Sequence, residues 1–369
     1  MNHCERAVPC AAIRVSRGNT VLFDGYFGRY CGGDPLEPAS YTTDEELPVP
    51  TDSSRFDLAS LTKFLATAPL ILSLVEHGNV YFSTRIGEIL TGLTGATAAL
   101  TIEDLLTHSG GLPALPDLWQ GRSPEVDQRE EARARLFTVE PTAAPGRQIV
   151  YSCTGFILLG EVVQTVCGQG VAAAFSDFAG GAAGRDGSLG FSPTPSDREL
   201  YVPTEWCSWR QRRVQGTVHD ENAHVLGGAA GNAGLFGTLP AVHELFLREW
   251  GAALGVHRRD PLLTRETVLA AVKPRRVLPL GSPLHDRPRG STERRGLGMQ
   301  IVPDTQRGGF GAGAFGHTGF TGTSVWGDPA TGVAVTILTS RLYYGRESTT
   351  DGILAFRRLV HESALRRYG

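Results

Sequence analysis

Lysine is scarce in this chain of 369 residues, and that scarcity makes each lysine informative. Of the 35 basic residues only two are lysines, Lys63 and Lys273, and all the others are arginines. An arginine guanidinium stays protonated in proteins, whereas a desolvated lysine ammonium can lose its proton near neutral pH. Lys63 lies three residues after Ser60, so we interpret it as a proton acceptor for a serine hydroxyl.

The chain also lacks several patterns that would indicate other kinds of protein. A net charge of −3 argues against nucleic acid or an anionic membrane as a partner. The longest apolar run, residues 64–75, is too short to span a bilayer and predicts a buried helix without membrane insertion. The start has no basic-then-apolar secretory signal, which predicts a cytoplasmic protein, or a periplasmic one if the natural start lies upstream.

Cysteines are few and show no metal-binding pattern. They form no CxxC pair and no cluster with histidine at metal-ligand spacing, so we expect free thiols in a reducing compartment, no metal and no cofactor. The six cysteines are Cys4, Cys10, Cys31, Cys153, Cys167 and Cys207.

Apolar periodicity predicts strands near both ends of the chain and helices between them. Two strand-like runs, 11–15 and 20–26, read as a hairpin around Gly18. Further strands are expected at 297–302, 323–326 and 333–339, and a closing amphipathic helix at 350–367. The first internal helix is expected to begin at Ser60. Further helices are expected at 102–107, 125–137, 154–166, 239–254 and 265–272, and an exposed loop at 279–295.

This order of elements predicts an α/β (α+β) fold in a single domain over residues 1–369. Residues 1–59 and 290–369 would form an antiparallel sheet flanked by helices, and residues 60–289 a mainly helical lobe. A cleft between two such lobes is a common place for a functional site.

The first candidate for chemistry is the pair Ser60 and Lys63. At the start of a helix, residues three apart share a face, so Lys63 can take the Ser60 proton while the serine attacks an acyl carbon. Backbone N–H groups at the same helix start suit a developing oxyanion. The alternative is a capping serine followed by a surface lysine.

Two further segments complete a possible site. Tyr151 precedes an apolar helix, where a neighbouring ammonium would let it shuttle a proton to a leaving group; the alternative is a packed aromatic residue. The run from Gly316 to Gly322 contains small residues beside which a substrate can lie, and the N–H of Phe320 could complete an oxyanion hole with that of Ser60. The alternative there is a glycine-rich turn.

The ordered motifs S-x-x-K, Y-x-x and H-T-G resemble those of the penicillin-recognising serine hydrolases. That superfamily includes class C β-lactamases, D,D-carboxypeptidases, D-aminopeptidases and related esterases. The run L-L-T-H-S-G-G-L-P at 105–113 also resembles its helix-to-loop signature. The resemblance implies a β-lactamase/transpeptidase-like fold, an acyl-enzyme freed by water without a metal, and a small-molecule substrate. It implies as catalytic residues Ser60, Lys63, Tyr151 and His317, with the oxyanion hole at the N–H groups of Ser60 and Phe320.

A segment at 216–236 resembles the branch that contains penicillin-binding protein 4B and the muramoyl-alanine amidases. Its polar residues could face the substrate, or they could only cap and brace a glycine-rich bend. The residues expected to bind substrate are His219, Asp220, Glu221, Asn222, Cys153, Thr318 and Gly319.

Two positions depart from the pattern of the family. Cys153 stands where the family usually has asparagine or aspartate, and a thiol poorly replaces an amide that bonds both the lysine and a substrate carbonyl. His317 stands where β-lactamases have lysine, and histidine is only partly charged near neutral pH. Both changes point away from efficient penicillin hydrolysis.

The leading hypothesis is a serine hydrolase that cleaves an amide or ester in a small molecule, such as a cell-wall fragment, a D-amino-acid peptide or an ester. One alternative is a carboxylesterase with little peptidase activity. Another is a catalytically impaired binding or sensing protein, which Cys153 favours. A metal hydrolase using His108, His219 and His317 is disfavoured because their spacing suits no shared ion. The sequence leaves the oligomeric state open.

Overall fold

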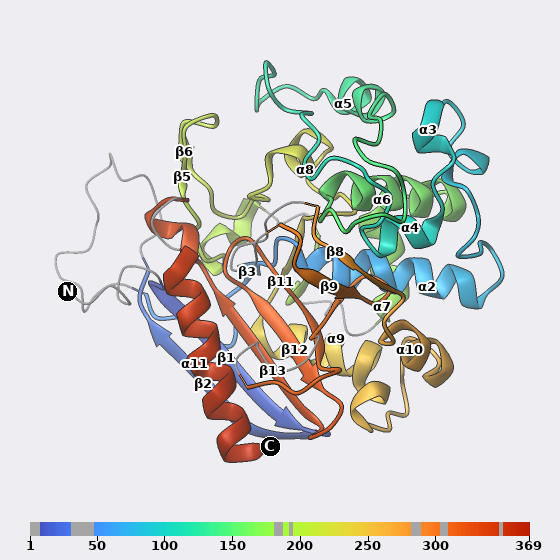
Figure 1. Cartoon of the computed structure of the whole chain (residues 1–369). Coiled ribbons are helices and arrows are strands. Elements are labelled where there is room, and N and C mark those ends of the chain that lie inside the picture. The colour runs from blue at the N-terminus through green and yellow to red at the C-terminus, as the bar shows by residue number, and fades with distance from the viewer. Residues whose placement is uncertain are drawn as a thin grey trace.

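The largest sheet is antiparallel and joins both ends of the chain (Figure 1). The computed structural model describes residues 8–30, 48–180, 187–191, 195–281, 289–302, 309–346 and 350–369. Within them this sheet has eight strands in the order β2-β1-β13-β12-β11-β10-β9-β8. The strands are β1 (Cys10–Arg17), β2 (Thr20–Gly28), β8 (Arg276–Pro279), β9 (Thr292–Arg295), β10 (Gln300–Ile301), β11 (Phe315–Thr318), β12 (Ser324–Asp328) and β13 (Val333–Thr339).

The predicted hairpin and the predicted fold class are confirmed. β1 pairs with β2 on one side and with β13 on the other, where Ile13 lies opposite Ile337. Gly18 adopts a φ of 61° in the connecting turn, a conformation that glycine accepts without a Cβ clash. The first and last strands are therefore neighbours in the sheet, although most of the chain separates them.

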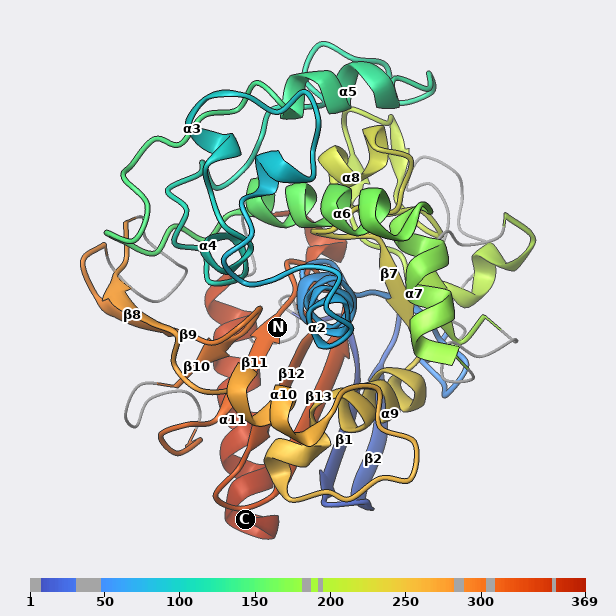
Figure 2. The same ribbon diagram turned by 90° about the vertical axis from the view of Figure 1, so that its right-hand side faces the viewer.

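Helices cover both faces of this sheet (Figure 2). On one face lies α11 (Thr350–Tyr368), which shares a buried cluster with Trp326 of β12 and Val335 of β13. On the other face, α9 (Leu239–Trp250) contacts β1 and β13. Its buried His243 bonds through Nδ1 to Thr336 Oγ1 and through Nε2 to Ser16 Oγ, each at 2.9 Å. These two bonds fix α9 against both strands.

The remaining elements lie mostly between β2 and β8 in the chain, and α6 is the central buried helix among them. The helices are α2 (Ala68–Glu76), α3 (Gly95–Ala98), α4 (Ile102–Leu106), α5 (Arg129–Leu136), α6 (Cys153–Cys167), α7 (Val171–Ala179), α8 (Glu221–Val225) and α10 (Arg265–Ala271). Two small sheets contain β3 (Phe56–Asp57), β7 (Leu235–Gly237) and β4 (Leu189–Phe191), and β5 (Trp206–Cys207) with β6 (Arg212–Arg213). Short segments of other helix types are η2 (Lys63–Thr67), η3 (Ile86–Glu88), η5 (Pro195–Leu200), η6 (Gly251–Leu254) and η7 (Arg341–Tyr344).

One expectation about secondary structure is wrong. The stretch 279–295 was expected to be an exposed loop, but β9 occupies its end and pairs with β8. Glu293 and Arg295 on β9 are buried and form an ion pair at 3.0 Å. A half-buried strand usually alternates apolar and polar residues. A strand whose inward-facing residues are charged lacks this alternation, so its sequence resembles that of a solvated loop. Residues 282–288 lie outside the described part of the chain.

The division into a sheet subdomain and a helical lobe stays a prediction. Strand β8 belongs to the large sheet and α9 packs on it, although both fall within the range 60–289 expected for the lobe. Among the described residues no single helix is long and apolar enough to cross a bilayer. The bent pair α6 and α7, which meet at 73°, satisfies that test by length and composition.

Candidate active site

Ser60 lies in a tight turn between β3 and the following helix. Ala59, just before it, has a φ of 47°, which is unfavourable for a residue with a Cβ. The carboxylate of Asp57 accepts the N–H of Ala59 at 2.8 Å and that of His219 at 2.6 Å. The buried carboxylate thus stabilises the turn that presents Ser60 at the start of the helix.

Lys63 is fully buried and points at Ser60. Its Nζ donates to Ser60 Oγ at 2.8 Å and to the backbone oxygen of Asn232 at 3.0 Å. It begins η2, a single π-helical turn that leads into α2. Such turns are rare and occur often at functional sites. The alternative of a surface lysine is therefore wrong.

Tyr151 and Cys153 reach the same point from the start of α6. Ser152 caps this helix by accepting the N–H of Gly155 at 3.1 Å. The Tyr151 hydroxyl interacts with Ser60 and Lys63, and the Cys153 thiol interacts with Lys63 and Asn232. We call Ser60, Lys63, Tyr151 and Cys153 the catalytic cluster.

Burial dominates the electrostatics of the catalytic cluster. It raises the pKa of Tyr151 and the pKa of Cys153, so both side chains are neutral near pH 7. Burial lowers the pKa of Lys63, but its interactions with Cys153 and Tyr151, which act once those groups are ionised, raise the pKa overall.

The H-T-G motif lies beside Tyr151 at the end of β11. Within the described residues, strand β10 pairs with Phe315 and Gly316 of β11, just before His317 and Thr318. His317 Nδ1 donates to the Thr318 oxygen at 2.8 Å, and its ring centroid lies 5.8 Å from that of Tyr151. The structure thus brings all four predicted catalytic residues together.

The predicted oxyanion hole depends on how the loop after β11 meets the serine turn. Thr321 Oγ1 donates to the Asp57 oxygen at 2.7 Å and Thr323 Oγ1 to the Leu58 oxygen at 3.1 Å. In the described part of the chain, the N–H groups of Ser60 and Phe320 donate to no protein acceptor. Both N–H groups therefore remain available to a substrate oxygen, and their role stays a prediction.

The polar segment at 219–222 is bonded within the fold. The buried His219 bonds through Nδ1 to Thr204 Oγ1 at 3.1 Å, and Asp220 caps α8 by accepting the N–H of Ala223 at 2.7 Å. Asn222 Oδ1 accepts the N–H of Leu118 at 3.0 Å. These contacts match the capping and bracing alternative, and direct contact with a substrate stays a prediction.

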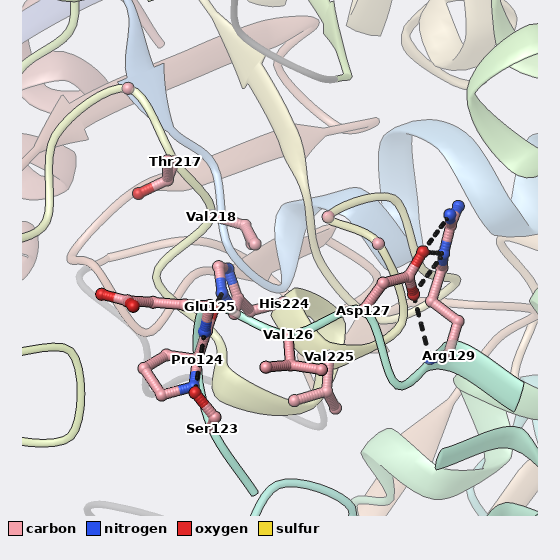
Figure 3. Close-up of a pocket in the computed structure, with 13 residues that line it drawn as sticks. Ser123, Pro124, Glu125, Val126, Asp127, Arg129, Thr217, Val218, His224 and Val225 are labelled. Carbon is pink, nitrogen blue, oxygen red and sulfur yellow. Dashed lines mark hydrogen bonds and ion pairs between the residues drawn. The ribbon is translucent and has the colours of Figure 1, made fainter. Parts of the chain in front are cut away.

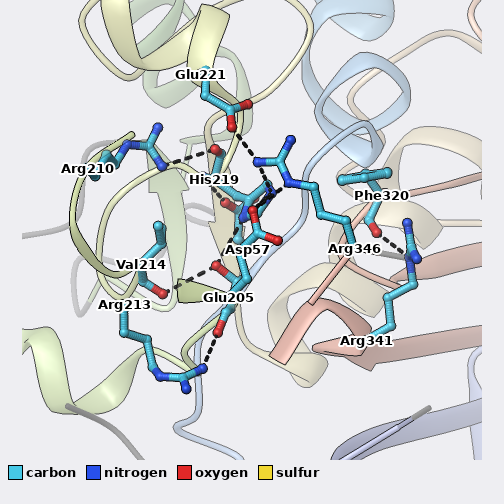
Figure 4. A network of polar contacts seen from close by, with 11 residues as sticks. Asp57, Glu205, Arg210, Arg213, Val214, His219, Glu221, Phe320, Arg341 and Arg346 are labelled. Atoms are coloured by element: carbon cyan, nitrogen blue, oxygen red, sulfur yellow. Dashed lines mark hydrogen bonds and ion pairs between the residues drawn. The ribbon is translucent and has the colours of Figure 1, made fainter. Parts of the chain in front are cut away.

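Charged side chains surround His219 and form a second polar group (Figure 4). We call this group the arginine network; its members are Glu205, Arg210, His219, Glu221 and Arg346. Arg346 forms ion pairs with Glu221 and, at 2.6 Å, with Glu205. Arg210 donates to the backbone oxygen of His219 at 3.1 Å. Burial and the nearby positive charge of Arg346 hold the pKa of His219 well below its ordinary value, so its imidazole is neutral.

Sequence reasoning missed three residues that shape the site: Asp57, His108 and Asn232. His108 accepts the N–H of Ser152 at its Nδ1 at 3.0 Å, and its ring centroid lies 4.6 Å from that of Tyr151. Burial holds the pKa of His108 well below its ordinary value, so a neutral imidazole supports Tyr151. His108 belongs to the 105–113 motif and Asn232 to the segment at 216–236, whereas nothing in the sequence marked Asp57.

Across the described ranges of the chain, no three His, Cys, Asp or Glu side chains are grouped to hold a metal ion. His108 bonds to Ser152 and His219 to Thr204, on separate elements. Four cysteines that the structure describes are free thiols: Cys10, Cys153, Cys167 and Cys207. Cys4 and Cys31 lie outside the described residues.

A pocket of about 420 Å³ lies between the loop 123–129 and the bend 216–228 (Figure 3). His224 borders it, and its Nε2 donates to the Pro124 oxygen at 2.9 Å. None of the four predicted catalytic residues lines this pocket, so it is separate from the catalytic cluster.

The chain belongs to the Beta-lactamase family, whose family model matches residues 3–358. It is 26% identical over 370 residues to a "Putative D-alanyl-D-alanine carboxypeptidase" of Escherichia coli (strain K12), an alignment that covers 90% of this chain and 78% of that protein. It is also 26% identical to an "N-acetylmuramyl-L-alanine amidase" of Bacillus subtilis (strain 168), with 86% of this chain and 73% of that protein covered.

A penicillin-binding protein homologue from Caulobacter crescentus has a similar structure, with a TM-score of 0.69 at 19% identity. The match covers 96% of this chain and 93% of that one. Together, family and fold place the chain in the class of β-lactamase-related hydrolases with a β-lactamase/transpeptidase-like fold.

Proposed function

We propose that the protein hydrolyses an amide or ester bond of a small molecule through an acyl-enzyme on Ser60. The observation that carries this proposal is the fully buried Lys63, whose Nζ lies 2.8 Å from Ser60 Oγ. A lysine in that position has no solvent-exposed role, and it lies within the distance at which a base accepts a proton.

The geometry supports a two-step mechanism. Lys63 in its neutral form takes the Ser60 proton as Oγ attacks the acyl carbon, and the N–H groups of Ser60 and Phe320 stabilise the oxyanion. The proton then passes from the Lys63 ammonium through the Tyr151 hydroxyl to the leaving amine or alcohol, and the ester to Ser60 remains. Water attacks that ester, the acid leaves, and the Ser60 hydroxyl recovers its proton.

The names of the two curated relatives favour a D-amino-acid peptide or a cell-wall fragment as the substrate class. One observation favours a simple ester as a second candidate. The side chain at position 153 is a thiol, which offers a peptide substrate a weaker hydrogen-bond partner than an amide would. A carboxylesterase with little peptidase activity is therefore the alternative.

Labelling with a fluorophosphonate, followed by mass spectrometry, tests the mechanism. We expect one adduct on Ser60 in the wild-type protein, none in Ser60→Ala, and loss of ester and D-alanyl anilide hydrolysis in that variant. Ser53→Ala is the matched control, because Ser53 is exposed and bonds to Asp52 away from the cluster. No adduct on wild-type Ser60 would support the binding or sensing alternative instead. A panel of p-nitrophenyl esters, D-alanyl anilides, a muramoyl peptide and nitrocefin then separates the substrate classes.

A further inference from the structure

The loop from Gly319 to Thr323 packs tightly against the backbone that precedes Ser60. A Cβ on Gly319 would lie 2.5 Å from the Leu58 oxygen, and Gly322 adopts a φ of 108°, which favours glycine. The Gly319 N–H donates to the Thr323 oxygen at 2.7 Å and closes the loop. The two glycines thus let the loop lie against the serine turn, and these contacts fix the orientation of its peptide groups.

Arg357 reaches three carbonyl oxygens of this loop from the middle of α11. Its Nη2 donates to the Gly319 oxygen at 3.2 Å and to the Thr323 oxygen at 2.9 Å, and its Nε donates to the Gly322 oxygen at 3.2 Å. Arg357 is buried, with 8% of its surface exposed. A guanidinium offers N–H donors in one plane, and its hydrogen bonds are about twice as strong as those of a neutral donor. The helix that closes the fold is therefore bonded to the loop that carries Phe320.

One of these bonds acts on the peptide group whose N–H belongs to Phe320. That peptide group has the Gly319 oxygen at its other end, because the two residues are adjacent. The Gly319 oxygen accepts the Arg357 guanidinium and also the Gly322 N–H, at 3.0 Å. Since the amide is stabilised by resonance, donors at its oxygen draw electron density from its nitrogen and make its N–H a stronger donor. In the described part of the chain this N–H has no protein acceptor, so it is available to a substrate.

We propose that Arg357 is a positioning residue for the oxyanion hole, where it orients and polarises the peptide between Gly319 and Phe320. The substrate oxygen gains negative charge as Ser60 attacks, and the stronger Phe320 N–H then stabilises it more than it stabilises the neutral carbonyl. This difference lowers the barrier to acylation. Arg341 bonds to the Phe320 oxygen, which belongs to the next peptide, so it does not polarise this N–H in the same way. The inference rests on the proposed function, because the oxyanion forms only if Ser60 is acylated.

A pair of substrates that differ in one atom measures the strength of the oxyanion hole. The first, p-nitrophenyl acetate, has a carbonyl oxygen, and the second, p-nitrophenyl thionoacetate, has sulfur in its place. Sulfur accepts hydrogen bonds weakly, so the thionoester gains less from the N–H groups. Release of p-nitrophenol in a single turnover, with enzyme in excess, gives the acylation rate of each substrate. The ratio of the two rates therefore reports on the hole, whereas a displaced Ser60 lowers both rates together.

Arg357→Met keeps much of the side-chain length but removes the charge and the three bonds to the loop. We expect the ester rate to fall about tenfold and the thionoester rate by less than about twofold. Arg357→Lys keeps a cation but lacks the planar fork that bonds several oxygens, so its ratio should lie between those of Arg357→Met and the wild type. Arg358→Met is the matched control, because Arg358 is the next residue of α11 and is exposed. It should show wild-type rates with both substrates.

Thermal unfolding shows whether each variant is folded, and Arg357→Lys decides if Arg357→Met is not. A wild-type ester rate, or equal slowing of both substrates, would overturn the inference while Ser60-dependent release upholds the proposed function. Release of p-nitrophenol by the wild-type protein no faster than by Ser60→Ala would overturn both the proposed function and the inference.

Discussion

Two polar groups lie on either side of the serine turn, and they are built in opposite ways. In the catalytic cluster, the one basic side chain is Lys63, and no carboxylate in the described part of the chain lies within ion-pair distance of it. In the arginine network, Arg346 is paired with both Glu205 and Glu221. An ion pair favours the charged form of a cation, so a lysine without a paired carboxylate gives up its proton more readily. The difference explains why the chain uses lysine at one place and arginine at the other.

Asp57 connects the two groups. Its carboxylate accepts an N–H from His219 in the arginine network and another from Ala59 beside Ser60. Its backbone oxygen also accepts the hydroxyl of Thr321, in the loop that holds Phe320. The geometry of the serine turn therefore depends on contacts from both sides.

Exchanging lysine for arginine in the catalytic cluster should have the largest effect. Lys63→Arg keeps the charge but removes the base that contacts Ser60 Oγ, so we expect fluorophosphonate labelling to slow by about a thousandfold or more. The rate of adduct formation on Ser60 measures this. Lys273→Arg is the control, since Lys273 is exposed, and it should label at the wild-type rate. Substantial labelling of Lys63→Arg would mean that Lys63 is only a cation.

Asp57 should make the stability depend on pH. Burial raises its pKa from 3.8 to about 6, so the folded protein binds this proton more tightly than the unfolded chain does. The contribution of Asp57 to the free energy of unfolding is therefore fully present below about pH 4. It falls by about 3 kcal/mol as the pH rises through 6. Urea unfolding at pH 4, 5 and 7 should show this decrease in the wild type and a smaller one in Asp57→Asn. Equal pH dependence in both proteins would refute the assignment.

Arg341 should have an intermediate effect, because it contacts Phe320, whose N–H is expected in the oxyanion hole, through both the carbonyl oxygen and the ring. Its Nε donates to the Phe320 oxygen at 2.6 Å, and its guanidinium lies 4.5 Å from the centre of the Phe320 ring. Arg341→Lys loses this geometry, and we expect labelling to slow by about tenfold. Arg366→Lys on the exposed end of α11 should leave the rate unchanged. If Arg341→Lys is labelled at the wild-type rate, the Phe320 N–H does not contribute to the oxyanion hole as expected.

The smallest effect should come from Arg346. It is 41% exposed, and ion pairs of such residues contribute about 1 kcal/mol or less. Arg346→Lys should therefore change the free energy of unfolding by less than about 1 kcal/mol and labelling by less than about threefold. Urea unfolding and labelling kinetics measure the two quantities. If labelling of Arg346→Lys is instead tenfold slower, the arginine network takes part in the reaction, and it no longer differs from Lys63 in this respect.

Local features of the fold were predictable, because they depend on short-range patterns. The hairpin around Gly18 and the closing helix α11 follow from strand and helix periodicity. The pairing of Ser60 with Lys63 follows from the three-residue spacing at a helix start. Strand β9 was missed because its inward residues Glu293 and Arg295 are charged.

What the sequence by itself determined is the identity of the reacting groups: one serine, one nearby lysine, a tyrosine and a histidine in motif order. Only the tertiary structure decided how they work. Asn232, which supports Lys63, is 169 positions away, and Thr321 meets Asp57 across 264 positions. Burial and long-range contacts set the proton affinities and the open N–H groups, and no local pattern encodes which distant backbone oxygen will face a buried ammonium.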